Sequence, residues 1–182
     1  MWIHRESEAW TQAVRAGWQA LTQARGLPDE WDILVALGDC FRMLGRSEEA
    51  WCCNLLTLER SPLAETQQHA AHSLALIAAL RGDEASFDYF SAKVDEAEVS
   101  TMGRGQILFE RGQALLALGR PEGPEALEEA LRYAEESKLG KLVFDIEAAL
   151  ELERPWEPLL GPDLVARDTE EEKIRTQLQP LV

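Results

Sequence analysis

The amino-acid sequence predicts an all-α protein built from repeated pairs of helices. Three glycines, Gly45, Gly82 and Gly119, stand 37 residues apart, and each closes an apolar run and opens an acidic one. A fixed period of this length is typical of stacked-repeat proteins, in which no single unit can bury its apolar face alone. Apolar residues also recur at helical steps of three and four, and the sequence has no sustained strand-like alternation.

The first predicted helix covers residues 5–25 and is expected to cap one end of the array. Gly26 and Pro28 follow it and favour a helix end. Its apolar residues follow one another at steps of four, four and three, which places them on one helix face: Trp10, Val14, Trp18 and Leu21.

The first complete helix pair is predicted for residues 27–63. Pro28 stands in the first turn of one helix, and Gly45 ends that helix. Ser47 is expected to cap the second helix, because a serine side chain can accept a hydrogen bond from an N–H of the first turn. Pro62 marks the end of the pair.

The same helix pair is expected twice more, at residues 64–100 and 101–139. In the middle pair, Gly82 and Asp83 separate a helix over residues 63–81 from one that continues to about residue 98. In the third pair, a longer turn with two prolines separates two further helices, over 102–118 and 124–138. A helix over residues 141–153 is expected to cap the other end of the array.

Residues 155–182 are predicted to form a linker and a charged tail. Pro155, Pro158 and Pro162 forbid regular helix over the linker. The tail carries only a thin set of apolar residues, so it is expected to be weakly helical or frayed. Self-association through this tail is one alternative for the protein's function.

The first helix pair closely resembles the tetratricopeptide repeat (TPR). It has the helix glycine, the aromatic residue, the turn glycine, the small residue and the closing proline of that family at matching intervals, namely Gly38, Phe41, Gly45, Ala50 and Pro62. The resemblance covers about three repeats, from residue 28 to residue 138. It implies a TPR-like α-solenoid, in which antiparallel helix pairs stack into a right-handed superhelix.

The other two pairs depart from the TPR pattern at particular positions. The third pair is similar to the family through its glycines and small residues, but Arg111 stands where the family prefers leucine. The middle pair is the poorest copy, since Ala75 replaces the helix glycine and Phe87 stands where a small residue is expected.

The resemblance also implies where a partner docks. In TPR proteins, partners usually bind the concave groove that the first helix of each pair lines. The matching positions in this chain are Asp32, Val35, Asp39, Arg42, His69, His72, Leu76, Gln106, Phe109 and Gln113. A groove that mixes acids, histidines and an aromatic ring suits a basic or amphipathic segment of a protein or peptide. The alternative is that these are solvated helix positions without a ligand.

Composition restricts the class of partner and the location. The net charge of −15 disfavours nucleic acid and anionic membrane surfaces, and it favours a basic partner. The alternative is that this charge serves solubility. No apolar run is long enough to span a membrane, and the N-terminus lacks the apolar core of a signal peptide. The three cysteines are too few for a disulfide framework and indicate a reducing cytoplasm.

The sequence predicts no catalytic site, cofactor or metal. His69 and His72 share a helix face with Glu65, but two or three exposed ligands are weak evidence for a metal ion. There is no phosphate-binding glycine loop, nucleophile elbow or metalloprotease motif. The predicted function is therefore a non-catalytic protein–protein interaction module. The alternatives are a sensory or regulatory module that binds a small ligand or signalling peptide, and a self-assembling scaffold.

Overall fold

The computed structural model describes residues 2–95, 99–152 and 176. Within these ranges the protein is all-helical, with eight α-helices and no strand, which confirms the predicted all-α class. The helices are α1 (Trp2–Ala24), α2 (Glu30–Met43), α3 (Ser47–Arg60), α4 (Ala64–Leu80), α5 (Glu84–Ser91), α6 (Thr101–Ala117), α7 (Gly123–Glu136) and α8 (Gly140–Leu152). Apart from Thr176, the predicted linker and tail lie outside the described residues. The stacking of helix pairs into a solenoid stays a prediction.

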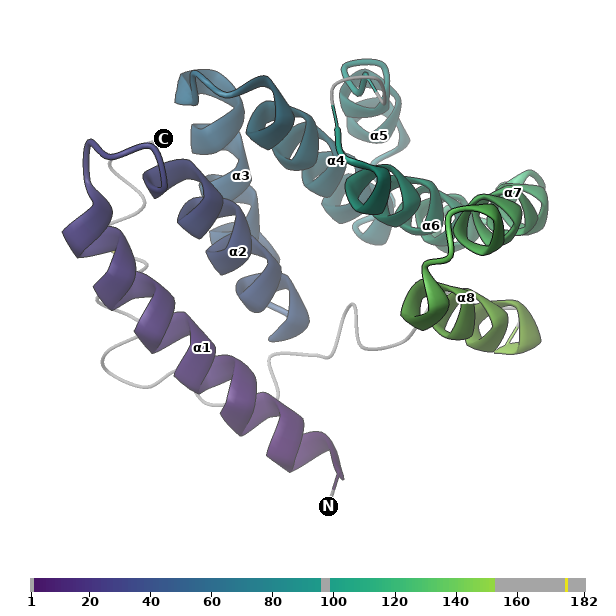
Figure 1. Cartoon of the computed structure of the whole chain (residues 1–182), viewed down its shortest axis with the longest axis horizontal. Coiled ribbons are helices and arrows are strands. Elements are labelled where there is room, and N and C mark those ends of the chain that lie inside the picture. Colours follow the sequence, from purple (N-terminus) through teal and green to yellow (C-terminus); the bar gives the residue numbers. More distant parts are fainter. Residues whose placement is uncertain (1, 96–98, 153–175, 177–182) are drawn as a thin grey trace. The chain divides into compact units, whose positions relative to one another are not determined.

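The chain divides into two compact units, with the boundary between Ala70 and Ala71 inside α4. In the first unit, α2 packs against both α1 and α3 (Figure 1). In the second unit, α7 packs against both α6 and α8 (Figure 1). The two helices of the first predicted pair therefore lie against each other, and so do the two helices of the third pair.

The three evenly spaced glycines end their helices in the same way. Gly45, Gly82 and Gly119 have φ values of 72°, 72° and 66°, which are left-handed conformations that favour glycine. In each turn, the N–H after the glycine donates to a carbonyl five residues back, over 2.9 Å. This is the Schellman helix end, and it satisfies carbonyls that the helix itself leaves unpaired. The 37-residue spacing in the sequence thus marks three equivalent helix ends.

Two glycines inside helices allow close contact within the first and third helix pairs. A Cβ atom added at Gly38 of α2 would lie 2.5 Å from Nδ2 of Asn54 on α3. A Cβ atom at Gly112 of α6 would lie 2.6 Å from Cδ2 of Leu127 on α7. Both distances are shorter than van der Waals contact, so the glycines let the paired helices approach closely.

Two predicted helix ends differ from the structure. α3 begins at Ser47 itself, and its N-cap is Arg46 with no side-chain capping hydrogen bond. The prediction that the second helix of the middle pair continues to about residue 98 is wrong, because α5 ends at Ser91. Two short-range bonds, from Lys93 N–H to Phe90 (3.0 Å) and from Val94 N–H to Ser91 (3.2 Å), tighten the chain beyond that end. α5 therefore has 8 residues, whereas α3 and α7 each have 14.

Replacing Lys138 by glycine is expected to stabilise the protein. Lys138 follows α7 with φ 58°, and the bond from Leu139 N–H to the Ala134 carbonyl (2.9 Å) repeats the Schellman pattern. A residue with a Cβ atom is strained there, so Lys138→Gly should raise the free energy of unfolding by about 0.5–1 kcal/mol. Chemical denaturation measures this change. As a control, Gly82→Ala introduces the same strain where no atom lies within 4 Å, and it should lower stability. A loss of stability in Lys138→Gly would contradict the prediction.

Replacing Gly112 by alanine is expected to destabilise the protein. The new methyl group would meet Leu127 at Cδ2 (2.6 Å) and at the backbone nitrogen (3.1 Å), and Leu127 is 1% exposed. Overpacking of this kind costs about 1–3 kcal/mol. Thermal unfolding should show the loss in Gly112→Ala but not in Gly140→Ala, because no atom lies within 4 Å of the Cβ position at Gly140. Equal stability of the two variants would show that the helix pair accommodates the methyl group.

Candidate functional site

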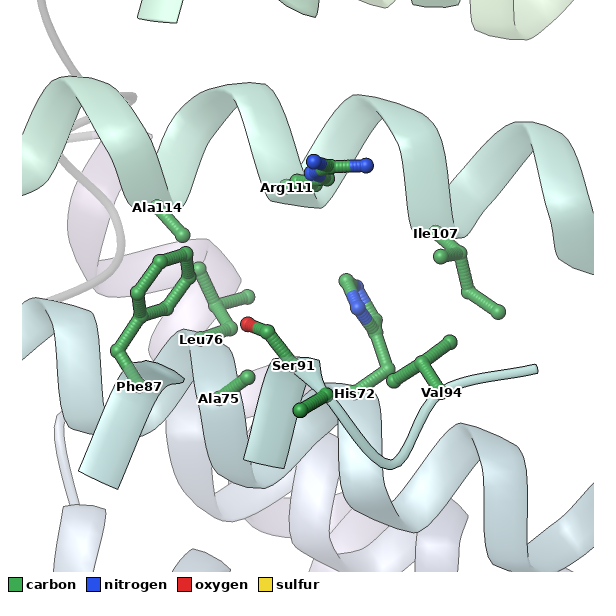
Figure 2. Close-up of a pocket in the computed structure, with 10 residues that line it drawn as sticks. His72, Ala75, Leu76, Phe87, Ser91, Val94, Ile107, Arg111 and Ala114 are labelled. Atoms are coloured by element: carbon green, nitrogen blue, oxygen red, sulfur yellow. The ribbon is translucent and has the colours of Figure 1, made fainter. Parts of the chain in front are cut away.

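A cavity of about 290 Å³ lies in the second unit between α4, α5 and α6 (Figure 2). On α6 the lining residues follow one another at steps of four and three, so this helix presents one continuous face to the cavity. The lining consists of His72, Ala75 and Leu76 from α4, Phe87, Ser91, Ala92 and Val94 from α5 and the turn after it, and Ile107, Arg111 and Ala114 from α6.

The cavity adjoins the early end of α5. Ser91 is the last residue of this helix, and the chain then turns so that Val94 also contributes to the wall. Three of the lining residues are alanines, whose small side chains leave the space between the helices unfilled. The short helix and the small residues together account for the cavity.

His72 is the buried polar residue of the lining. It is 6% exposed, and its side chain points from α4 towards α6 (Figure 2). Its Nε2 atom lies 2.9 Å from Oε2 of Glu110. Gln106 donates from Nε2 to the other carboxylate oxygen, Oε1, over 2.8 Å. An ionised carboxylate only accepts hydrogen bonds, so both oxygens of Glu110 have a donor within this cluster.

Arg111 and Ser91 are the other polar residues of the lining. Arg111 stands on α6, on the opposite side of the cavity from His72, and the Ser91 hydroxyl points into the space (Figure 2). In residues 2–95 and 99–152, neither side chain has a hydrogen bond or ion pair. The cavity therefore offers an exposed guanidinium and a hydroxyl beside apolar side chains such as Phe87 and Ile107.

Arg120 holds α5 in place from the turn after α6. Its guanidinium donates to both oxygens of Asp88 (2.9 and 3.0 Å) and to Glu84 (3.2 Å). It also lies 5.1 Å from the centre of the Phe87 ring, which forms part of the cavity wall. The hydrogen bonds from Arg120 lower the pKa of Asp88, and the hydrogen bonds to Asp88 and Glu84 raise the pKa of Arg120.

Some of the predicted groove residues of the first unit contact other residues of that unit. Asp32 accepts a hydrogen bond from the Thr66 hydroxyl over 3.1 Å. Asp39 pairs with Arg42 over 3.4 Å, and Arg42 is 9% exposed. Two further members of the set, Val35 and His69, are half-buried.

The second unit brings part of the predicted set together. His72 and Leu76 line the cavity, and Gln106 is joined to His72 through Glu110. Phe109 is instead a core residue, packed in a cluster with Leu127 and Ile146, and its ring is not presented as a binding surface. Gln113 is 2% exposed and is likewise buried.

The groove prediction did not include most of the cavity lining. Three of the missed residues stand where the chain departs from the TPR pattern, namely Ala75 at the helix-glycine position, Phe87 at a position for a small residue and Arg111 at a position for leucine. In the sequence, these departures from the repeat pattern were the features that could have indicated the cavity. Ser91 and Val94 had no such signal, because their place in the wall depends on where α5 ends.

The described residues give little support to metal or thiol chemistry. They contain no group of three or more histidine, cysteine, aspartate or glutamate side chains that could hold a metal ion. Burial raises the pKa of the Cys40 thiol, with a further contribution from Asp39, and burial also raises the pKa of the Cys53 thiol. A thiol with a raised pKa stays protonated at neutral pH and is a poor nucleophile.

Comparisons of the chain with protein-family models, with curated proteins and with solved structures find no match. Among the helices of the described ranges, none has the length and apolar character needed to cross a membrane. The cavity and its side chains are therefore the basis for inferring a function.

Replacing Arg120 by glutamine is expected to weaken the protein at neutral pH more than in acid. The pKa of Asp88 is lowered from its ordinary value of 3.8, so its bond to Arg120 contributes stability above that pH. The contribution is lost as the pH falls through the lowered pKa of the folded state. Denaturation midpoints of the parent and Arg120→Gln should therefore differ at neutral pH and converge in strong acid.

Arg132 on α7 provides the control for this pH series. It is exposed, and Arg132→Gln removes the same charge without removing a hydrogen bond to α5. A difference between the parent and Arg120→Gln that stayed constant at all pH values would contradict the assigned role of Asp88.

Proposed function

We propose that the protein is a non-catalytic interaction module that binds a segment of a partner protein. In this proposal its helix pairs stack as a TPR-like solenoid of antiparallel helices. Three helix ends with the same hydrogen bonds, 37 residues apart, support the repeat. The close contacts at Gly38 and Gly112 support it further, because these glycines occupy the family's helix-glycine positions.

The cavity between α4, α5 and α6 is the observation that carries the proposal. It includes His72 and Leu76, two positions at which a TPR-like array would meet its partner. Its volume of about 290 Å³ is near the lower end of the range of about 300–1,000 Å³ for ligand pockets. We infer that one apolar side chain of the partner enters it as an anchor, since buried anchors supply much of the affinity of an interface.

The charge of the chain favours particular segments. With a net charge of −15, the protein attracts basic residues that flank the anchor and speeds their association. Within the described residues, none of the three cysteines forms a disulfide, which supports a reducing, cytoplasmic location for the interaction.

A sensory module that binds a small ligand is the second candidate. The size of the cavity favours it, because a space for one side chain also accommodates a small molecule. In that case, binding would stabilise the second unit without any peptide segment.

Filling the cavity tests the proposed function. Ser91→Trp places a large ring where the hydroxyl now points into the space (Figure 2). Segments selected from a random peptide library on the parent protein should bind Ser91→Trp at least about tenfold more weakly, because the anchor would lose its pocket. Fluorescence anisotropy with the labelled segments measures this loss.

Ala85→Trp is the matched control, since it adds the same ring to an exposed position on α5 outside the lining. It should bind the segments as the parent does, and circular dichroism should confirm that both variants are folded. Equal binding by the parent and Ser91→Trp would place the segments elsewhere. Recovery of no segment from the library would favour the small-ligand alternative.

A further inference from the structure

We propose that the side chain which enters this cavity is that of a tyrosine, an aromatic ring that carries one hydroxyl group. The inference rests on the proposed function, because it names the anchor of the partner segment. In this assignment, Nδ1 of His72 accepts a hydrogen bond from the tyrosine hydroxyl, and the apolar side chains of the lining surround the ring.

The hydrogen bond between His72 and Glu110 decides which nitrogen of the imidazole carries the proton. Nε2 lies 2.9 Å from Oε2 of Glu110, and an ionised carboxylate only accepts hydrogen bonds. The proton of the neutral imidazole therefore lies on Nε2, and Nδ1 is left as an acceptor. Gln106 donates to the other carboxylate oxygen over 2.8 Å and holds Glu110 in this arrangement.

The Nδ1 atom of His72 is the acceptor that this residue offers to a bound group. His72 is 6% exposed and belongs to the lining, and within the described ranges its side chain has Glu110 as its hydrogen-bond partner and no other. An occupant without a donor would cover Nδ1 and leave it without a partner, which is unfavourable for a buried polar atom. The cavity therefore favours a group that donates a hydrogen bond.

The other polar residues of the lining distinguish a hydroxyl from other donors. The Ser91 hydroxyl points into the space from α5 (Figure 2), and a serine hydroxyl both donates and accepts. A tyrosine hydroxyl can donate to His72 and accept from Ser91, whereas an indole N–H only donates and a phenylalanine ring does neither. Arg111 only donates, so it cannot replace His72 as the acceptor. Among aromatic side chains, tyrosine therefore matches the polar groups of the lining best.

The apolar part of the lining suits the ring of a tyrosine. Phe87 is buried and forms part of the wall, and two aromatic rings attract each other in offset or edge-to-face arrangements. Leu76 and Ile107 are also buried and add aliphatic surface from α4 and α6. The volume of about 290 Å³ suits one ring and does not accommodate several residues. A ring with a single polar tip thus satisfies both parts of the cavity.

NMR titration with matched probes tests the assignment on the full chain. The free probe is N-acetyltyrosine amide, and the peptide probe is acetyl-Lys-Gly-Tyr-Gly-Lys-amide, whose lysines supply the basic flanks. Each probe is compared with its phenylalanine and O-methyltyrosine equivalents, which have no hydroxyl proton to donate. Both tyrosine probes should bind at least about tenfold more tightly than these equivalents, because only the tyrosine hydroxyl gives Nδ1 of His72 a donor.

Three variants locate the effect. His72→Phe keeps a ring and removes the acceptor, so it should abolish the preference for tyrosine over phenylalanine. His69→Phe makes the same change on α4 outside the lining and should keep the preference. Glu110→Gln should reduce the preference without abolishing it, because a glutamine side chain both donates and accepts and no longer fixes the proton on Nε2. Thermal unfolding of each variant excludes loss of the fold as the cause.

Ser91→Ala tests the second contact and leaves the buried pair of His72 and Glu110 unchanged. It removes one hydroxyl from the lining, so it should narrow the preference for tyrosine and leave the binding of the phenylalanine probes unaltered. This variant also gives an independent readout if His72→Phe does not fold. Weakening of the tyrosine and phenylalanine probes by the same factor would contradict a hydrogen bond from Ser91.

The outcomes separate this inference from the proposed function. Equal binding of the tyrosine and phenylalanine probes, an undiminished preference in His72→Phe, or no binding of either tyrosine probe at millimolar concentration would overturn the tyrosine assignment. If Ser91→Trp still abolished binding of the selected segments, the proposed function would survive that failure. Binding of the free tyrosine probe without the peptide would support the hydroxyl contact to His72 and count against a partner segment.

Discussion

The left-handed residue that follows a helix is the constraint on which the rest of this structure depends. At Gly45, Gly82 and Gly119 the positive φ lets two N–H groups bond back to the last turn, so the helix stops and the chain reverses within a few residues. Without that reversal, α2 could not meet α3, and α6 could not meet α7. The helix glycines can permit close contact only because the turns have already brought those helices together.

The middle of the chain shows what happens when only part of this pattern is kept. The turn at Gly82 is present, and Asp83 caps α5 by accepting the N–H of Ser86 over 3.0 Å. Arg120 then fixes α5 through Asp88 and Glu84. α5 nevertheless ends at Ser91, and the cavity lies beside that end. α5 is therefore held by hydrogen bonds before Ser91, whereas the helix itself does not extend along the rest of the cavity.

The sequence predicted those parts of the fold that single residues determine. Gly45, Gly82 and Gly119 allowed three helix ends to be predicted, because few other residues adopt a positive φ. The end of α5 was not predictable in this way, since no glycine or proline occurs between Phe87 and Val99. The bonds from Lys93 N–H to Phe90 and from Val94 N–H to Ser91 show a tighter turn there, which no residue type in the sequence marks. The core position of Phe109 was missed because assigning it to a groove required knowing which face of α6 the neighbouring helices cover.

The candidate site was predicted less completely than the fold. A cavity forms where the side chains of several helices leave space unfilled, and no single residue determines that. His72 and Leu76 were named from their positions in a repeat, and both line the cavity. Ala75, Phe87 and Arg111 were noticed only as departures from that repeat. These departures belong together in the structure, since α4, α5 and α6 bring them to the same cavity. A residue that breaks a repeat pattern is thus a better indicator of a site here than one that keeps it.

The charge of the whole chain and the charge of the cavity act at different distances. Exposed charges more than about 8 Å apart are largely screened at physiological salt, so the net charge of −15 acts mainly on approach and through nearby surface contacts. Among the described residues of the cavity lining, Arg111 carries a positive charge, which acts on a group in the cavity at short range. The net charge alone therefore does not describe the electrostatics of the cavity, because an acidic chain places a positive charge in the described part of its lining.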